Sequence, residues 1–435
     1  MRGLSIAGTV AVVFVSAVSF AAEQSGPGTT PKQIPLIDVT DLYHPHQDVG
    51  DNFDILAAYA LPELDLRAVI LDCTEPFRQP VAQNPGPGLH PDAAGPREPG
   101  FIPVWQLNYI FGRNVPCAAS PFTRMRSPED KMLDVPAFQQ QGIELILKTL
   151  RDSADPVHIV SFGSARAIAV AYNREPELFR RKLACLHLSA GGSSPPVAGY
   201  IEWNVALDPQ AIVCLLRSEL PIALYPCAAN NAGSKGYGVF SPAFSYDPHN
   251  TFWKLPNRRF IRQMDPPLRR YLEYALGRAN RVDFLRAVEV DGPPLDEGLF
   301  GAEHYVWETA VWLCLTGRKL VRRADGSHRI VLPTEVLPTD RVLPNELRPC
   351  TVQVRNDGIY EFRLTDQPTN FRVYYRGNPQ ENEAALREAL PALYLSFKAS
   401  ASRFGPPASS DKIPHEKTTT RPGHAPPSQA QQAPQ

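Results

Sequence analysis

Five aspartates lie close together in and after the apolar segment at residues 34–40: Asp38, Asp41, Asp48, Asp51 and Asp54. They fall within one loop and the first turn of the helix predicted after it, so their charges would repel one another unless a cation or several hydrogen-bond donors lay between them. Carboxylate oxygens are hard ligands that suit Ca²⁺ or Mg²⁺. The same spacing also fits a solvated loop with an aspartate at the helix N-cap, and it does not decide between the two.

The segment that carries these aspartates reads as the start of an α/β sheet. Residues 34–71 run as a short apolar strand, the acidic loop, an amphipathic helix and a second strand. Residues 157–163 and 183–192 are further apolar strands that end at glycines, with helical patterns between them. Such alternation implies parallel strands with right-handed crossovers. We therefore predict an α/β fold, a mostly parallel open sheet flanked by helices, with its ligand site at the carboxyl ends of the strands.

The C-terminal part of the chain has a different pattern. Asp-Gly turn signals at 325–326 and 357–358 are each flanked by β-rich runs, and a helical pattern follows them. We predict an α/β domain over residues 33–320 and a small β-hairpin and helix region over 321–400. Residues 402–435 are rich in Pro, Ser and Gln and are predicted to be a disordered tail.

The N-terminus has the pattern of a secretory signal. Arg2 precedes an apolar run from Leu4 to about Phe20 and a small-residue cleavage site, so residues 1–22 are predicted to be a signal peptide. The mature protein is then expected to be secreted or periplasmic, with no stable membrane span. An uncleaved anchor is the alternative, because the run is near the lower limit of roughly 17 residues for a span.

Composition narrows the classes of partner. The chain has 44 basic and 45 acidic residues and a formal charge of -1, with no block of like charge, so nothing favours a nucleic acid or a membrane surface. A small-molecule partner stays open, as does a homo-oligomer. Seven cysteines without a CxxC pair argue against a zinc knuckle and a disulfide-dense scaffold, and leave one or two disulfides open.

Three motifs occur in a fixed order along the chain. The strand, acidic loop and helix of residues 34–71 include Pro62-Glu63 just before the second strand. Gly163 to Ala169 follows the next strand, with Glu175-Pro176-Glu177-Leu178 in the helix after it. The third is Glu202-Trp203-Asn204, followed by Asp208-Pro209-Gln210-Ala211. Together these motifs resemble the inosine-uridine preferring nucleoside hydrolases, whose corresponding segments read DxDxGxDD with PE, GPLTNIA with DPEL, and EFN with DPEA.

The resemblance implies hydrolysis of the N-glycosidic bond of nucleosides or related ribosides by a Ca-activated water. The transition state of that reaction is oxocarbenium-like, and a cation beside a carboxylate base makes a nucleophile near neutral pH. It implies calcium ligands at Asp41, Asp48 and Asp51, with Asp48 and Asp51 as the catalytic carboxylates. Glu202 and Asn204 match residues that contact sugar hydroxyls; alternatively, Asn204 only caps a turn.

The acidic loop departs from the family pattern. Aligned from the Pro-Glu landmark, Gly50 stands where the family has the aspartate expected to act as base, and Asp48 is the nearby carboxylate that could substitute. The loop is also longer by an insertion that holds His44 and His46. We interpret these histidines as solvated or structural rather than as ligands.

Two later positions depart as well. Arg166 falls near the family threonine whose carbonyl binds the metal, where its charge would compete with the cation. Val306-Trp307 stand where many members have a His-Asp pair, with Glu303, His304 and Glu308 nearby. Glu308 could replace the missing ligand, but we favour a solvent-facing helix position for it.

These departures motivate two alternatives to an enzyme. One is a catalytically degenerate nucleoside-binding or sugar-binding protein on the same fold, which Gly50 and the missing His-Asp pair favour. The other is an interaction protein that uses only the scaffold. Binding of a nucleoside without turnover would distinguish the first from a hydrolase, and a specific calcium site would count against the second.

Overall fold

The computed structural model describes residues 32–78, 97–192, 194–196, 200–228 and 247–404. The predicted signal peptide at 1–22 lies outside these residues, as does most of the predicted tail, although a short helix continues the chain to Phe404. Within the described part of the chain, no helix is both long and apolar enough to cross a membrane.

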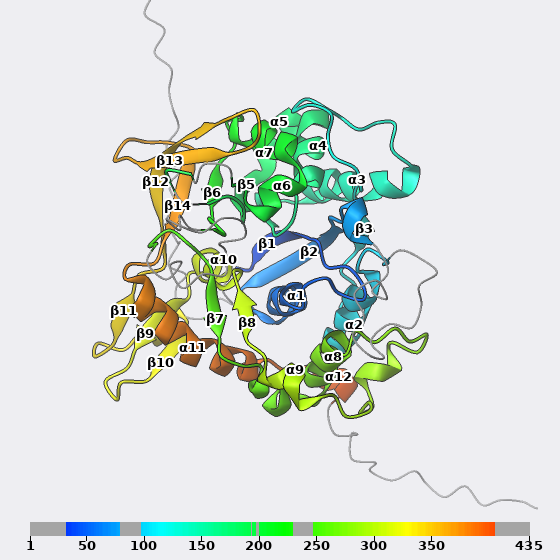
Figure 1. The fold of residues 1–435 in the computed structure, drawn as a ribbon, viewed down its shortest axis with the longest axis vertical. Coiled ribbons are helices and arrows are strands. Elements are labelled where there is room, and N and C mark those ends of the chain that lie inside the picture. Colours follow the sequence, from blue (N-terminus) through cyan, green and yellow to red (C-terminus); the bar gives the residue numbers. More distant parts are fainter. Residues whose placement is uncertain (1–31, 79–96, 193, 197–199, 229–246, 405–435) are drawn as a thin grey trace, which may run out of the picture.

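A nine-stranded sheet forms the centre of the molecule (Figure 1), and its strands lie in the order β13-β12-β14-β6-β5-β4-β1-β2-β3. The run from β14 to β3 is parallel throughout, while β12 is antiparallel to both of its neighbours. The bounds of these strands are β1 Ile34–Thr40, β2 Leu64–Leu71, β3 Cys117–Ala119, β4 Val157–Ser161, β5 Leu183–Leu188, β6 Ile222–Leu224, β12 Glu346–Val354, β13 Tyr360–Leu364 and β14 Phe371–Tyr375.

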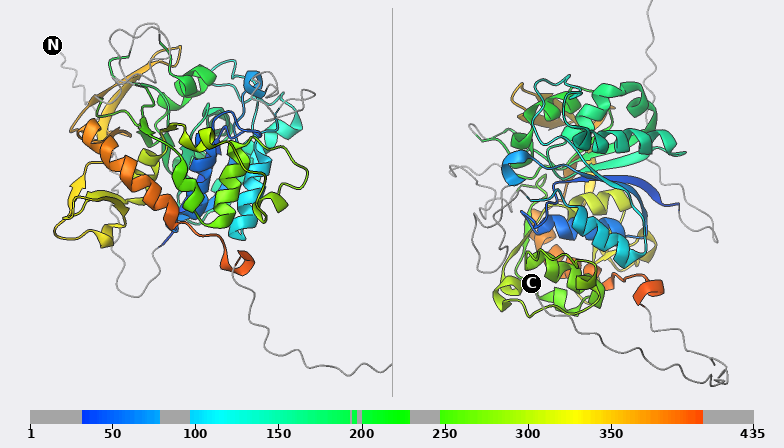
Figure 2. Two further views of the ribbon diagram at one scale, coloured as in Figure 1. Left: turned by 60° about the horizontal axis from the view of Figure 1, so that its bottom comes forward. Right: turned by 90° about the vertical axis from the view of Figure 1, so that its right-hand side faces the viewer.

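Helices cover both faces of this sheet, so the molecule has three layers (Figure 2). One face packs on α3 Ala137–Asp152, α4 Arg166–Arg174, α5 Pro176–Lys182 and α7 Pro209–Leu216. The other packs on α1 Gly50–Ala60, α2 Phe101–Phe111, α8 Pro266–Leu276, α10 Thr309–Thr316 and α11 Pro379–Ser396. Strands buried on both faces explain the nearly continuous apolar runs in the sequence. The predicted fold class, a mostly parallel open sheet between helices, is confirmed.

The smaller elements lie around these layers. Two short sheets are present, β7 Trp253–Leu255 with β8 His304–Val306, and β9 Lys319–Arg322 between β10 His328–Val331 and β11 Arg341–Leu343. The short helices are α6 Trp203–Leu207, α9 Glu297–Gly301 and α12 Ala401–Phe404.

The predicted C-terminal β-rich region is present, and its strands divide between two sheets. Strands β9, β10 and β11 form the separate three-stranded sheet, whereas β12, β13 and β14 extend the central one. The join is a parallel pairing of Phe371 with Ile222 and of Val373 with Leu224. The boundary predicted at residue 320 therefore does not coincide with an edge of the sheet. Local turn signals located the strands but could not identify their partner.

Substitution of a core residue in β14 tests this join. Val373 is fully buried, so Val373→Ala should lower the free energy of unfolding by about 2 kcal/mol. All five tryptophans precede residue 313, so urea unfolding followed by tryptophan fluorescence reports only the earlier part of the chain. We expect the substitution to lower the midpoint of that transition.

The matched control is Val342→Ala in β11, where the side chain is 46% exposed. This change should alter the free energy by no more than about 0.5 kcal/mol. An unchanged tryptophan transition in Val373→Ala would show that the C-terminal strands unfold separately from the rest of the sheet.

Candidate functional site: a carboxylate-lined cavity at the carboxyl edge of the sheet

A cavity of about 260 Å³ lies where three neighbouring strands end. Asp41, Phe162 and Ser189 line it, and each is the residue directly after a strand, namely β1, β4 and β5. Adjacent parallel strands present their carboxyl ends at one edge of the sheet, which is where such folds bind ligands. The remaining lining residues are Gln47, Asp48, Asp51, Glu202, Trp203, Asn204, Cys227, Trp307 and Glu308.

All five residues predicted for the site line this cavity: Asp41, Asp48, Asp51, Glu202 and Asn204. Their roles stay predictions. The other two aspartates of the acidic segment do not line it. Asp38 is inside β1 and Asp54 is inside α1, and both are buried. Burial raises the pKa of Asp38 to about 8.

Burial raises the pKa values of the carboxylates in the cavity, and repulsion between carboxylates adds to its effect on Asp41 and Asp51. The pKa of Asp51 is well above its ordinary value because of burial, with further contributions from Asp41, Asp48 and Glu308. Burial likewise raises the pKa of Asp41, and Asp72, Asp48 and Glu202 add to the effect. A set of oxygen donors that repel one another in this way is the kind that a hard cation stabilises. Within the described ranges, however, no three His, Cys, Asp or Glu side chains are already grouped so as to hold a metal ion. The carboxylates would therefore have to draw together around one.

Two carboxylates border the space that Gly50 leaves open. A Cβ atom at Gly50 would lie 3.3 Å from Asp48 Oδ1 and 3.6 Å from Glu308 Oε1. The Gly50 N–H also donates a hydrogen bond of 2.9 Å to Asp48 Oδ1, which fixes that carboxylate. This chain has glycine where the resemblance expects an aspartate, but Asp48 and Glu308 each place a carboxylate next to position 50.

The solvent-facing position favoured for Glu308 is wrong. Glu308 is directly before the first residue of α10, at the end of the helix that faces the cavity. Burial raises its pKa to about 7. The sequence pattern does not show where α10 begins. The prediction treated Glu308 as a residue inside the helix, whereas it precedes the first helical residue.

The other late candidates do not line the cavity. His304 is buried against Phe53, with ring centroids 4.4 Å apart, and burial lowers its pKa to about 3. Glu303 is exposed and pairs with Lys254 at 3.3 Å. His44 and His46 are buried, which excludes the solvated interpretation of the loop histidines and leaves the structural one.

Glu202 is held rigidly at the start of α6. Its carboxylate accepts hydrogen bonds from the backbone N–H groups of Gly191, Asn204 and Val205, at 2.8, 3.0 and 3.2 Å. Burial nevertheless raises its pKa to about 7. The Asn204 side chain donates to the Ser189 carbonyl at 2.8 Å. The cap of this helix is therefore Glu202, and Asn204 ties the helix to the end of β5.

The sequence did not predict that Tyr360 contacts the loop next to Glu202. Tyr360 of β13 donates a hydrogen bond of 2.6 Å to the Ala190 carbonyl. Its ring packs directly on Gly191, where φ is +85° and a Cβ atom would lie 2.2 Å from the Tyr360 ring. Only glycine fits this position. The C-terminal strands thus support the loop that orients Glu202, and no local sequence signal connects residues so far apart.

Sequence reasoning also missed the apolar walls. Phe162, Trp203 and Trp307 line the cavity, and the Trp307 indole donates to the Cys227 carbonyl at 3.0 Å. Flat aromatic walls beside carboxylates suit a ligand with a planar ring and a hydroxylated part.

All seven cysteines, including Cys227, are free thiols.

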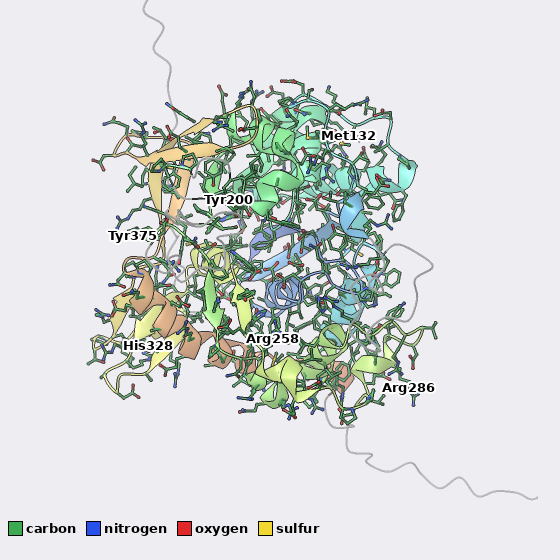
Figure 3. The ribbon with its side chains drawn as sticks, in the orientation of Figure 1. Met132, Tyr200, Arg258, Arg286, His328 and Tyr375 are labelled. Atoms are coloured by element: carbon green, nitrogen blue, oxygen red, sulfur yellow. The ribbon has the colours of Figure 1, made fainter. Side chains whose placement is uncertain are left out.

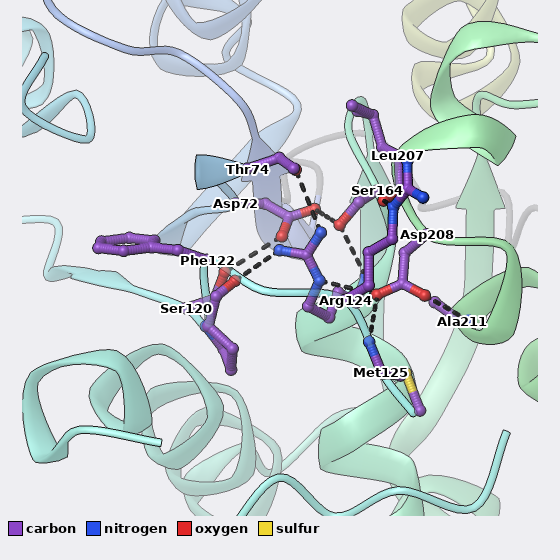
Figure 4. A network of polar contacts seen from close by, with 12 residues as sticks. Asp72, Thr74, Ser120, Phe122, Arg124, Met125, Ser164, Leu207, Asp208 and Ala211 are labelled. Carbon is purple, nitrogen blue, oxygen red and sulfur yellow. Dashed lines mark hydrogen bonds and ion pairs between the residues drawn. The ribbon is translucent and has the colours of Figure 1, made fainter. Parts of the chain in front are cut away.

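Arg166 does not approach the cavity, which corrects the prediction that it would compete with a cation. It is fully buried and forms an ion pair of 2.8 Å with Asp208. Its guanidinium also donates to the Pro121 carbonyl at 2.6 Å and to Thr74 Oγ1 at 3.1 Å. Figure 4 shows this network, in which Asp72 accepts bonds from Ser120 and Ser164. The network lies next to Asp41 of the cavity, since a Cβ atom at Gly163 would be within 3.3 Å of both Asp72 and Asp41.

The fold and the cavity define an α/β protein with a carboxylate site at the carboxyl edge of its sheet. No protein-family profile matches the chain. The chain is similar to curated ribonucleoside hydrolases. It is 37% identical over 99 residues to the pyrimidine-specific ribonucleoside hydrolase RihA of Escherichia coli O139:H28, a match that covers 21% of this chain and 30% of the relative. It is 28% identical over 195 residues to RihA of Citrobacter koseri, covering 40% and 55%. The chain thus matches only about a third to a half of these relatives' length.

Two solved structures align over most of the chain at low identity. They are the plant nucleoside hydrolase PpNRh1, at 14% identity with a TM-score of 0.45, and the purine-preferring ribonucleoside hydrolase of Gardnerella vaginalis, at 15% with 0.46. Each alignment covers 83% of this chain, and 100% and 99% of the respective structure.

The buried ion pair behind the cavity yields a stability prediction. Asp208→Asn keeps the shape of the side chain but leaves the Arg166 charge unpaired, so the free energy of unfolding should fall by about 3 to 5 kcal/mol. Chemical denaturation measures the change. Asp134→Asn is the control, because Asp134 pairs with Arg126 at the exposed surface, where such a pair contributes about 1 kcal/mol or less. Equal effects of the two substitutions would contradict the structural role of the network.

The raised pKa of Glu202 predicts a pH dependence of stability without calcium. The folded protein keeps this proton up to about pH 7, whereas the unfolded chain releases it near its ordinary pKa of about 4.3. Stability should therefore decrease as the pH rises between these values, and change little above them. Glu202→Gln should reduce the slope by up to about 1.4 kcal/mol per pH unit, and Glu303→Gln should not. Urea unfolding at several pH values in a chelator measures both slopes. Equal slopes in the wild type and Glu202→Gln would refute the assignment.

Proposed function

We propose that this protein hydrolyses the N-glycosidic bond of ribonucleosides. The observation that carries the proposal is the cavity itself, which joins Asp41, Asp48 and Asp51 of the first loop to Glu202 and Asn204 of a much later segment. These are the residues that the resemblance assigns to the cation and the sugar. Similarity to curated ribonucleoside hydrolases over 99 to 195 residues supports the same activity.

Glu202 and Asn204 bind the sugar in this proposal. The three backbone N–H groups on the Glu202 carboxylate fix its orientation, so its remaining acceptor capacity can meet a ribose hydroxyl without reorganisation. The base lies against the aromatic walls formed by Phe162, Trp203 and Trp307, which exclude water from one side of the scissile bond.

Asp41, Asp48 and Asp51 would hold Ca²⁺. When bound, the cation would lower the pKa of a water and orient the sugar hydroxyls. Asp48, fixed by the Gly50 N–H, accepts the proton of the attacking water. The water oxygen bonds to the anomeric carbon as the carbon–nitrogen bond breaks, and the base leaves with that electron pair. The surrounding carboxylates favour the positive charge that develops on the sugar.

Two finer assignments belong to the same proposal. The resemblance favours inosine and uridine as substrates, and the curated relatives are named as pyrimidine-specific, so these nucleosides and cytidine form the first substrate panel. We also propose that residues 1–22 direct export and that the mature protein acts outside the cytoplasm.

The test combines calorimetry with an assay of base release. The wild type should bind Ca²⁺ after removal of metal and release base from at least one nucleoside of the panel. Asp51→Ala should abolish calcium binding, and Asp48→Asn should lower kcat by about 10² to 10⁴-fold, the usual contribution of a general base.

Glu303→Gln is the matched control, because Glu303 is on the nearby segment but points away to Lys254. It should leave calcium affinity and turnover unchanged. Unchanged calcium affinity in Asp51→Ala would refute the loop assignment. Nucleoside binding without release of base at any calcium concentration would favour the degenerate binding protein instead.

A further inference from the structure

Aromatic side chains follow one another along the outer side of α2. Phe101, Trp105 and Tyr109 are spaced four residues apart, so they lie on one side of the helix. Trp105 is 47% exposed, and the other two are half-buried. Val104 and Leu107 are fully buried on the inner side. The helix therefore presents a row of three rings outward.

Neighbouring elements extend this row on both sides. The ring of Phe284 stacks on Trp105, with centroids 5.9 Å apart and 28° between the planes. Phe138, at the start of α3, is 46% exposed, and its ring centroid lies 6.0 Å from that of Phe101. Phe101 and Trp105 are themselves 5.9 Å apart. We call these five residues the aromatic strip: Phe101, Trp105, Tyr109, Phe138 and Phe284.

The loop that carries Phe284 is tied to α2 and adds apolar surface. The Gln106 side chain donates a hydrogen bond of 3.0 Å to the Phe284 carbonyl. Val282 and Leu285 are exposed beside it, and Arg286 of the same loop is labelled in Figure 3. Single exposed apolar residues are ordinary, whereas a contiguous apolar surface marks an interaction site.

The last residues that the structure describes lie at one end of the strip. The Ser400 N–H donates to the Ile110 carbonyl at 3.0 Å, where α2 ends. The Phe404 ring packs edge-on against Tyr109, with centroids 5.9 Å apart, and the Arg403 guanidinium lies 4.6 Å from the centre of the Tyr109 ring. Helix α12 is thus held against α2 (Figure 1), and the chain continues from the strip itself.

The segment that follows has a composition that suits an aromatic surface. Residues 405–435 hold seven prolines, and the first ten of them read GPPASSDKIP. A segment of this kind cannot bury a core of its own. Proline favours the extended polyproline II conformation, however, and aromatic surfaces bind such segments at a low cost in conformational entropy.

The length of this segment matches the strip. In the polyproline II conformation ten residues span about 30 Å. Along α2 the eight residues from Tyr109 to Phe101 rise by about 12 Å, and Phe138 lies 6.0 Å farther on. Residues 405–414 are therefore long enough to follow the whole strip from Phe404.

We propose that the aromatic strip is the docking site of the chain's own residues 405–414. The segment lies extended along α2, with Pro406 and Pro407 nearest Trp105, and with Ile413 beyond Phe101, near Phe138. Attachment at Phe404 gives the segment an effective concentration of about millimolar at the strip, so even weak contacts hold it there. A segment of another protein lacks this advantage. The inference is independent of the proposed function, because no residue of the strip lines the cavity.

The test is photo-cross-linking in the full-length chain. The photoreactive analogue p-benzoylphenylalanine is placed at position 413, and the cross-linked peptides are identified by mass spectrometry. We expect cross-links to the peptides that contain Trp105 or Phe138. The sample is an equal mixture of unlabelled and ¹⁵N-labelled protein, so that a cross-link between two copies is distinguished from one within a copy. The same analogue at position 430 controls for nonspecific contact and should not enrich these peptides.

Substitutions in the strip test its part in docking. Trp105→Ala should lower the cross-link yield about ten-fold, the effect expected for loss of an aromatic anchor. The fold should tolerate this change, because the side chain is nearly half exposed. Leu337→Ala is the matched control. Leu337 is 51% exposed in the segment before β11, and its substitution should leave the yield unchanged.

A second measurement needs no photoreactive group. The fluorescence of Trp105 is obtained as the difference between the wild type and Trp105→Phe, and its quenching by acrylamide reports how far the indole is covered. Pro406→Gly combined with Pro407→Gly should remove the protection of Trp105. Pro426→Gly combined with Pro427→Gly removes two prolines outside the proposed segment and should leave the protection intact.

The possible results separate the occupants of the strip. Cross-links within one copy that depend on Trp105, with loss of protection in the first proline pair only, support the proposal. Cross-links between copies overturn it and make the strip an interface between two molecules. Cross-links that avoid the strip, or equal quenching in both proline pairs, overturn it as well and leave the strip to a different protein. None of these results depends on base release, so the proposed function stands or falls separately.

Discussion

The structure depends on the confinement of negative charge at one edge of a parallel sheet. Five carboxylates line the cavity, namely Asp41, Asp48, Asp51, Glu202 and Glu308. Burial and mutual repulsion raise the pKa of Asp51 and Asp41 well above the ordinary range. A protein with no use for such a site could lower its free energy by replacing these residues with apolar ones. Their presence in one cavity is the physical argument for a cationic ligand or a developing positive charge there.

The surrounding fold counters that repulsion partly with rigid hydrogen-bond donors. Glu202 receives three backbone N–H groups, and Asp48 receives one. Behind the cavity, Arg166 neutralises Asp208 in a fully buried network. Because Arg166 is occupied there, it adds no positive charge to the lining of the cavity. The C-terminal strands contribute in the same way, since Tyr360 fixes the loop whose Gly191 N–H orients Glu202.

The sequence predicts those parts of this arrangement that depend on residues close together in the chain. The parallel sheet could be predicted, because apolar strands alternate with helices within short segments. The aspartates could be placed at its carboxyl edge for the same reason. Pairings between residues far apart in the chain could not be predicted. The pairing of β14 with β6 and the hydrogen bond from Tyr360 to Ala190 are of this kind. Glu308 and Arg166 were misjudged for a related reason. Their side-chain directions depend on a helix start and on a distant partner, neither of which leaves a local pattern.

The division of charge around Asp48 bears on how the site could work without an aspartate at position 50. On one side Asp48 faces Glu308 across the space at Gly50, and on the other it interacts with Arg258 and Arg278. Arginine charges favour the ionised form of a carboxylate, while a neighbouring carboxylate and burial favour the protonated form. Asp48 is therefore held between opposing influences, with its orientation fixed by the Gly50 N–H. A carboxylate in that position can accept a proton and release it again, which is the requirement for a base that turns over. In the proposed hydrolysis, Asp48 takes the place of the aspartate missing at position 50, and Arg258 and Arg278 lower its pKa against the effect of burial.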